Sequence, residues 1–332
     1  MTGKPAFMLF FAFITLTLAF PATAGHRKAD RPEPEATPSP IALADVRLPH
    51  VPVARALALA DLRITLPPAC ANCASEPGLA VFSAVPGGGM RLSGRPVGTF
   101  GAADHPTAAA FPDPTFREIV GALASLPSGP PPRLLVVLDG RSVDSFILYL
   151  LTGGFRAAGV REVYLGVTAD TVIDTPYAPA VPIGRQAIFG GLDPEGIGAF
   201  FLPASGGDPS TGWHPCPAGP AGTPRCASLA DYDLPAYSAL LDELHRDHPD
   251  AGMVIGLPGG ASLDVVALLL STVQHAGKAP RIDSVAIAPG PGFDPNTSLP
   301  LSAVLPEPLV TPAQRIDATS TVPVLRILLD GP

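Results

Sequence analysis

Periodic apolar positions along the chain predict one order of elements that occurs twice. In the first stretch, two strand-like runs precede an amphipathic helix, a buried strand, a second helix and a last strand. The elements are the strands Leu79 to Val85 and Met90 to Val97, the helix carrying Phe116, Ile119, Val120 and Leu123, the strand Arg133 to Leu138, the helix carrying Val143, Phe146, Ile147, Leu150 and Leu151, and the strand Val163 to Val167. The pattern predicts a ββαβαβ unit.

The same order returns about 120 residues later, which is the signature of an internal repeat. Its elements are the strands Gln186 to Phe189 and Ile197 to Leu202, the helix carrying Tyr237, Leu240, Leu241 and Leu244, the strand Met253 to Leu257, the helix carrying Val266, Leu269, Leu270 and Val273, and the strand Ser284 to Ala288. The two stretches differ mainly before the first helix, where the second carries a loop from Trp213 to Cys226.

These patterns predict an α+β fold of two similar ββαβαβ domains, each a small mixed sheet with two helices on one face. The expected organisation is a signal peptide at 1–24, a Pro-rich tether at 25–61, a first domain at 62–170, a linker at 171–185, a second domain at 186–290 and a Pro-rich tail at 291–332. The tail ends in a strand-like run, Val322 to Leu329, that we expect to pair at a sheet edge.

The N-terminus has the pattern of a secretory signal. Lys4 precedes an apolar stretch from Ala6 to Phe20, which is short for a membrane-spanning helix. Ala22-Thr23-Ala24 then offers a cleavage site before Gly25. We therefore expect a periplasmic or secreted protein; an uncleaved signal that anchors the chain in the membrane is the alternative.

Charge and composition narrow the function classes. The net charge is −8, and the 21 basic residues form no run, which argues against a nucleic-acid partner. A hydrophobic content of 47% excludes a chain disordered throughout, whereas 43 prolines and 34 glycines predict long irregular connections.

The four cysteines form two local pairs, Cys70 with Cys73 and Cys216 with Cys226. In an oxidising compartment, an even number of cysteines in local pairs favours disulfides. The spacing of Cys70 and Cys73 also fits a redox motif, but they lie in a Pro-Pro-Ala loop rather than at a helix N-terminus, where a thiolate would be stabilised.

Two further groups of residues allow an enzymatic or metal-binding interpretation. Gly260-Ala-Ser262-Leu-Asp264 partly matches the nucleophile elbow of hydrolases, although a helix N-cap explains Ser262 more simply. His245 and His248 could share one helical face as metal ligands, but they also suit the C-terminus of a helix. We predict no catalytic residue, metal or cofactor.

Short motifs occur at defined places in the predicted elements: Leu66-Pro67 ahead of the domain, Gly89 to Gly94 in the hairpin, Leu138-Asp139 at a strand end, Ala158-Gly159 at a helix end, and Ala276-Gly277 in the second stretch. Together these motifs resemble the periplasmic domain of the ExbD/TolR family, the accessory subunits of proton-driven envelope motors. The resemblance implies structural roles for Leu66, Pro67, Asp139, Gly159 and Gly277.

The resemblance also implies a non-enzymatic interaction module. Domains of this family are thought to pair and to contact partner proteins or cell-wall material, so we expect the two copies to pack as a pseudo-symmetric dimer. The family keeps a transmembrane helix with a proton-handling aspartate, whereas Ala6 to Phe20 contains no acidic residue, so this chain should not translocate protons. The alternatives are an envelope hydrolase or thiol oxidoreductase using Ser262 or Cys70/Cys73, and a small-ligand binding protein with its site between the copies.

Overall fold

The fold is a mixed α/β arrangement in which one mixed sheet contains most of the strands. The computed structural model describes residues 41–42, 47–58, 79–85, 89–92, 95–98, 113–125, 133–138, 140, 145–178, 183, 186–203, 210–218, 222, 225–226, 229–257, 261–276, 279–283, 285–289, 315–316 and 321–329. The signal peptide, residues 66–67 and 70–73, Asp139 and Gly277 lie outside the described residues.

Each helix predicted from periodicity is present among the described residues. The helices are α1 (Asp113–Ala124), α2 (Ser145–Ala157), α3 (Leu234–Asp247) and α4 (Leu263–Gln274). The Asp233 side chain caps α3 by accepting a hydrogen bond from the backbone N–H of Ala236 at 2.9 Å. After α2, Gly159 has φ of 94°, the left-handed conformation that the sequence predicts for it.

Most of the strands agree with the predicted runs. The main sheet contains β2 (His50–Ala58), β3 (Leu79–Val85), β4 (Gly89–Leu92), β5 (Arg95–Gly98), β6 (Arg133–Leu138), β7 (Glu162–Gly166), β8 (Thr168–Ile173), β9 (Ala187–Asp193), β10 (Gly196–Leu202), β11 (Ser210–Pro215), β12 (Gly252–Leu257), β15 (Val285–Pro289) and β17 (Thr321–Leu328). The run expected as one strand from Met90 to Val97 is two strands, β4 and β5. The expected Trp213 loop begins as β11, and β8 enters the expected linker.

The strand order is the same on both sides of β17. From β17 outward, one side reads β7, β6, β3, β4, β5 and the other reads β15, β12, β9, β10, β11. On each side the three inner strands are mutually parallel and the two outer strands are antiparallel. Both predicted repeats therefore lie in one continuous sheet, and the expected separation into two small sheets is not observed.

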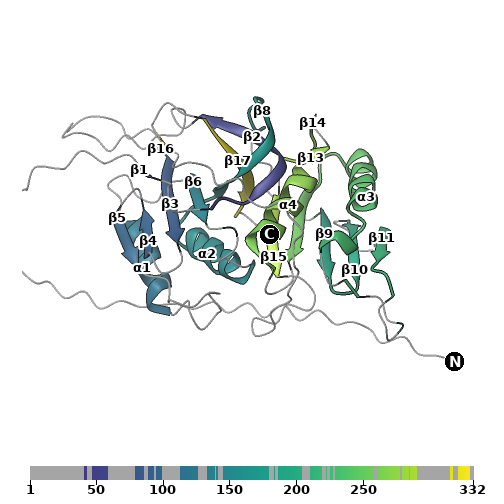
Figure 1. The fold of residues 1–332 in the computed structure, drawn as a ribbon, viewed down its shortest axis with the longest axis horizontal. Coiled ribbons are helices and arrows are strands. Elements are labelled where there is room, and N and C mark those ends of the chain that lie inside the picture. Colours follow the sequence, from purple (N-terminus) through teal and green to yellow (C-terminus); the bar gives the residue numbers. More distant parts are fainter. Residues whose placement is uncertain are drawn as a thin grey trace, which may run out of the picture. The chain divides into compact units, whose positions relative to one another are not determined.

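The middle of the sheet is formed by strands from opposite ends of the chain. β17 pairs with β7 on one side, and on the other it pairs with β2 and touches β15 at a single residue pair. Figure 1 shows β2, in purple, and β17, in yellow, side by side. The expectation that the C-terminal strand pairs at a sheet edge is therefore wrong. Residues 50–58 were expected to belong to the Pro-rich tether, but they form a strand with four buried apolar side chains.

The main core lies between one face of the sheet and all four helices. Alternate residues of the strands point to it, for example Leu134, Val136 and Leu138 of β6, as strand geometry requires. On the other face, Leu135 and Val137 belong to a second cluster, and Ile183, Ala187, Val254 and Ala286 form a third. The four helices therefore share one side, and among the described residues the opposite side carries two smaller apolar clusters.

Two smaller sheets and a short helix complete the described elements. They are β1 (Ile41–Ala42) with β16 (Arg315–Ile316), β13 (His275–Ala276) with β14 (Ala279–Pro280), and the 3-10 helix Leu229–Asp231. The β13–β14 pair follows α4 directly and so fixes the path of the chain beyond the last helical turn.

Candidate functional site

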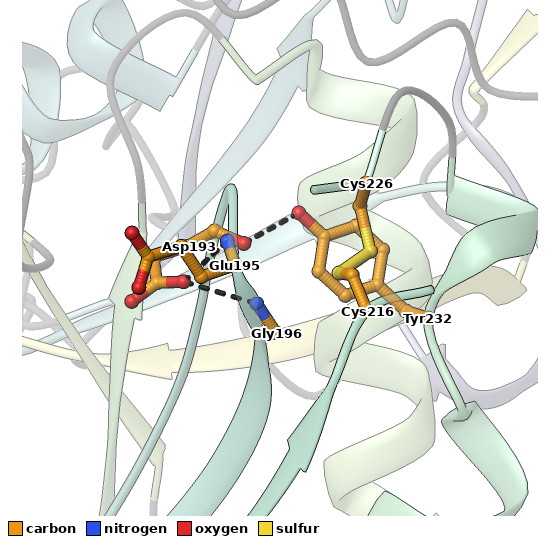
Figure 2. The surroundings of a disulfide bond; sticks show 6 residues. All are labelled: Asp193, Glu195, Gly196, Cys216, Cys226 and Tyr232. Carbon is orange, nitrogen blue, oxygen red and sulfur yellow. Dashed lines mark hydrogen bonds between the residues drawn. A yellow bond between two sulfur atoms is a disulfide. The ribbon is translucent and has the colours of Figure 1, made fainter. Parts of the chain in front are cut away.

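The predicted pairing of Cys216 and Cys226 is consistent with the structure. Figure 2 shows the disulfide, whose two Cα atoms are 5.3 Å apart. The bond closes the loop that follows β11. A disulfide at this position fits an oxidising compartment, as the pattern of cysteines predicts.

Hydrogen bonds fasten this disulfide loop to the turn between β9 and β10. The backbone N–H of Cys216 donates to the carbonyl of Glu195, and that of Cys226 donates to the carbonyl of Pro194. The Tyr232 hydroxyl donates to the Asp193 carbonyl at 2.7 Å, as Figure 2 shows. The turn itself is held by the Asp193 carboxylate, which accepts from two backbone N–H groups.

Replacing both Cys216 and Cys226 with serine should lower the free energy of unfolding by about 2–3 kcal/mol, because the disulfide closes a short loop. Urea unfolding at pH 7 measures the loss, and the wild-type chain in reducing buffer should show the same loss. Equal stability of the reduced and oxidised chains would contradict this expectation.

Glycines shape both faces of the sheet near this loop. A side chain at Gly190 would collide with Tyr237, and one at Gly212 would collide with Leu240, so α3 packs directly on the backbone there. Because successive residues of a strand face opposite sides, Gly191 and Trp213 belong to the helix-free face.

On the face of the sheet where no described helix packs, the Trp213 ring lies against the backbone of β10. A Cβ atom at Gly196 or Gly198 would collide with ring atoms of the indole, so the lack of a side chain at these two positions leaves room for the ring. The pairing register continues from Gly198 to Gly191 and from Gly191 to Gly256, a row without side chains across three strands. Beside this row, the rings of Phe189 and Phe200 stack 5.4 Å apart.

Trp213 is the largest exposed apolar side chain of the described residues, with 47% of its surface open to solvent. It is also the single tryptophan of the chain. Aromatic residues of this kind are enriched in the centres of protein interfaces. Trp213 therefore has the residue type and the exposure that are typical of an interface residue.

A second group of polar residues is buried where the two ends of the chain meet. Arg55 of β2 is 1% exposed and forms an ion pair with Asp283 at 2.5 Å. Arg326 of β17 is 2% exposed and contacts Glu162 at 3.1 Å. Both guanidinium groups lie near the ring of Tyr177, at 4.4 and 5.5 Å from its centroid.

Tyr177 and Gln274 link this network to the backbone. The Tyr177 hydroxyl donates to the Val324 carbonyl at 3.0 Å, and burial raises the pKa of this hydroxyl above its ordinary value. The Gln274 side chain bonds both the carbonyl and the N–H of Arg326. Because both guanidinium groups are buried and each has a carboxylate partner, removing one member of either pair would destabilise the junction between the two ends of the chain.

Ser262 occupies the N-cap position of α4, as the simpler interpretation predicts, although its side chain makes no capping hydrogen bond. The next histidine in the chain, His275, is the C-cap of the same helix. Twelve helical residues separate them by about 18 Å, too far for a nucleophile and its base. Asp264, two residues after Ser262, is buried and forms an ion pair with Arg47.

The turn between β6 and α2 contacts the turn between β12 and α4. The Ser145 N–H donates to the Ala261 carbonyl at 2.7 Å, and the Asp264 N–H donates to the Gly140 carbonyl at 3.2 Å. Ser145 and Asp264 both lie at the start of the helix that follows the turn in each predicted repeat. Hydrogen bonds therefore cross between the corresponding turns in both directions, as in an approximate two-fold arrangement.

His245 and His248, considered above as metal ligands, have different surroundings in the structure. His245 is half-buried, which lowers its pKa, and His248 stacks on Phe201. No group of three or more His, Cys, Asp or Glu residues suited to a metal occurs among the described residues.

One hollow lies where the first repeat meets the second. It has a volume of about 290 Å³ and is lined by Tyr149, Leu150 and Arg156 of α2 together with Ile287, Leu328 and Leu329. This volume falls at the lower limit of small-ligand pockets, so the hollow gives little support to a ligand site between the copies.

The sequence patterns considered above did not point to the buried arginines or to the Trp213 face. Arg55 and Arg326 each interrupt an apolar strand run, and a charge within such a run is the signal that could have marked them. The Gly-x-Gly spacing of Gly196 and Gly198 could have indicated a strand that seats a large ring.

The chain matches no protein-family model, no curated protein and no solved structure. None of the helices in the described part of the chain is both long and apolar enough to cross a membrane.

Proposed function

We propose that this protein is an exported, non-enzymatic interaction module in which two ExbD/TolR-like halves pair within one chain. The observation that carries the proposal is the identical order of strands on the two sides of β17. A duplicated unit that pairs through a two-fold axis generates such an order, because equivalent strands then lie at equal distances from the centre.

Two further observations support the pairing of the halves. The hydrogen bonds from Ser145 and Asp264 cross between equivalent turns in both directions. The helices α2 and α4, which hold the same place in the two repeats, contribute to one shared core. The Cys216–Cys226 disulfide supports export, because such bonds persist in oxidising compartments.

The partners we propose are envelope proteins or cell-wall material, bound on the face that carries Trp213. An exposed aromatic side chain on a rigid strand binds at low cost in conformational entropy. The disulfide three residues beyond Trp213 and the glycines beneath its ring supply that rigidity.

A crosslinking pulldown from envelope fractions tests this proposal. We expect the wild-type chain to capture motor subunits or cell-wall fragments, and we expect Trp213→Ala to reduce capture about 30-fold, the effect of losing a binding hot spot of about 2 kcal/mol. Val172→Ala is the matched control, because Val172 is 46% exposed on a different strand.

Three results would contradict the proposal. The first is capture of neither class of partner by the wild-type chain. The second is equal capture by Trp213→Ala and Val172→Ala, which would remove the Trp213 face from the interaction. The third is recovery of the chain from its native compartment with Cys216 and Cys226 as labelled thiols.

A further inference from the structure

His275 is a buried histidine that none of the interactions described above uses. It ends α4, and its backbone N–H donates to the Ser271 carbonyl. Only 3% of its surface is exposed, and neither ring nitrogen has a hydrogen-bond partner among the described residues. A neutral imidazole can remain in such a position, whereas a charged one cannot be buried without a partner.

The charged groups that face His275 are two cations and one anion. Arg55 comes from β2, and Arg281 and Asp283 come from the segment after β14. Asp283 is already occupied, since it pairs with Arg55 and accepts a hydrogen bond from the Ala178 N–H at 3.0 Å. A proton on His275 would therefore add a positive charge beside Arg55 and Arg281, whose carboxylate partners, Asp283 and Asp242, are already paired.

Desolvation opposes protonation more strongly than the end of α4 favours it. The dipole of a helix stabilises a cation at the C-terminus. Even so, burial, followed by the charge of Arg55, lowers the pKa of His275 to about 4. The folded chain thus resists protonation of this group at a pH where the unfolded chain accepts the proton.

The last turn of α4 joins strands from the two ends of the chain. The Ser271 hydroxyl donates to the Val53 carbonyl of β2 at 2.6 Å. The Gln274 side chain bonds the backbone of Arg326 in β17. A rearrangement of this turn would therefore loosen both strands together.

We propose that His275 is an acid-sensitive latch: when its imidazole takes up a proton, the last turn of α4 separates from β2 and β17. The imidazolium either moves away from Arg55 and Arg281 or forms an ion pair with Asp283 in place of Arg55. Both changes break the buried network. The β9–β11 segment, held by its disulfide, keeps its structure. This latch operates whatever partner the protein binds.

The pH range follows from linkage. Above pH 6.5 the histidine is neutral in both the folded and the unfolded chain, so the latch stays closed. As the pH falls from about 6.5 toward 4, only the opened form takes up the proton, and opening becomes progressively more favourable. Carboxylates in general begin to take up protons near the lower limit, so a variant is needed to isolate the histidine.

Hydrogen exchange of the full chain, followed by mass spectrometry, tests the latch. Between pH 7 and pH 4.5, and after correction for the intrinsic rate of exchange, amides of 50–58 and 321–328 should exchange about 10- to 50-fold faster relative to those of 187–202. In His275→Gln, which stays neutral, the relative change should be less than about twofold. His214→Gln, a half-buried histidine on β11, should behave as wild type.

Two outcomes would overturn the latch. One is a wild-type response that is uniform over all strands, a comparison that requires no variant and holds even where His275→Gln fails to fold. The other is a folded His275→Gln chain whose response equals that of wild type, which would assign the opening to the carboxylates.

Discussion

Replacing Arg55 with methionine is expected to lower the free energy of unfolding by about 3 kcal/mol. The variant keeps the apolar stem but leaves Asp283 without its charged partner, and removing one member of a buried ion pair costs about 3–5 kcal/mol. We expect a loss at the lower end of this range because the Asp283 side chain is 21% exposed and can be partly hydrated. The ring of Tyr177 and the Pro176 carbonyl also lose their contacts with the guanidinium. Urea unfolding at pH 7 measures the effect.

Two comparisons make this expectation specific. Arg156→Met, on the exposed side of α2, should change the free energy of unfolding by less than about 0.5 kcal/mol. Adding Asp283→Asn to Arg55→Met should recover part of the loss, since the carboxylate that lacked a partner is then neutral. A loss below about 1 kcal/mol in Arg55→Met would mean that the pair contributes no more than an exposed one.

Gly190→Ala is expected to destabilise the protein by about 2–3 kcal/mol. The new methyl group would overlap the Tyr237 hydroxyl and the Met253 methyl in the main core. Met253 is flexible and can move, but Tyr237 is 1% exposed on α3 and rigid, so the helix itself must shift. A lowered melting temperature with an unchanged far-ultraviolet circular dichroism spectrum at 25 °C would fit this expectation.

Gly121→Ala provides the matched control for that substitution. Nothing lies within 4 Å of a Cβ atom at this exposed position of α1, so the methyl group is accommodated. Alanine should stabilise the helix by about 0.5–1 kcal/mol. If both variants proved stabilising, the close packing of α3 on β9 would be refuted.

The sequence predicted most elements because their apolar periodicity is local. The buried run Arg133 to Leu138 and the spacing of Tyr237, Leu240, Leu241 and Leu244 each depend on a few neighbouring residues, and both agree with the structure. The cysteine pair could also be anticipated, because ten positions separate Cys216 from Cys226 in one loop.

The position of β17 could not be predicted in the same way. Pro323 lacks an N–H group and Arg326 carries a charge, and both features are typical of a sheet edge. The strand is nevertheless central because Glu162 and the Ala178 carbonyl accept hydrogen bonds from the Arg326 guanidinium, and Gln274 bonds its backbone. Those partners lie far away in the sequence, so no local pattern reveals them.

The candidate surface depends on non-local pairing too. The sequence places Trp213 in a predicted loop because glycine and proline residues lie close to it. Its position over Gly196 and Gly198 follows only from the register of β11 on β10. Residue type alone therefore predicted the chemistry of the disulfide but not the face that we propose for binding.

The central place of β17 also sets an order of events during synthesis. Residues 321–328 follow every other strand of the main sheet, so the sheet cannot become continuous across the two halves until those residues have been made. Contacts between β2 and β17 span more than 260 positions, and such distant contacts slow folding. A nascent chain would therefore lack the central strand of its sheet until residues 321–328 have left the ribosome.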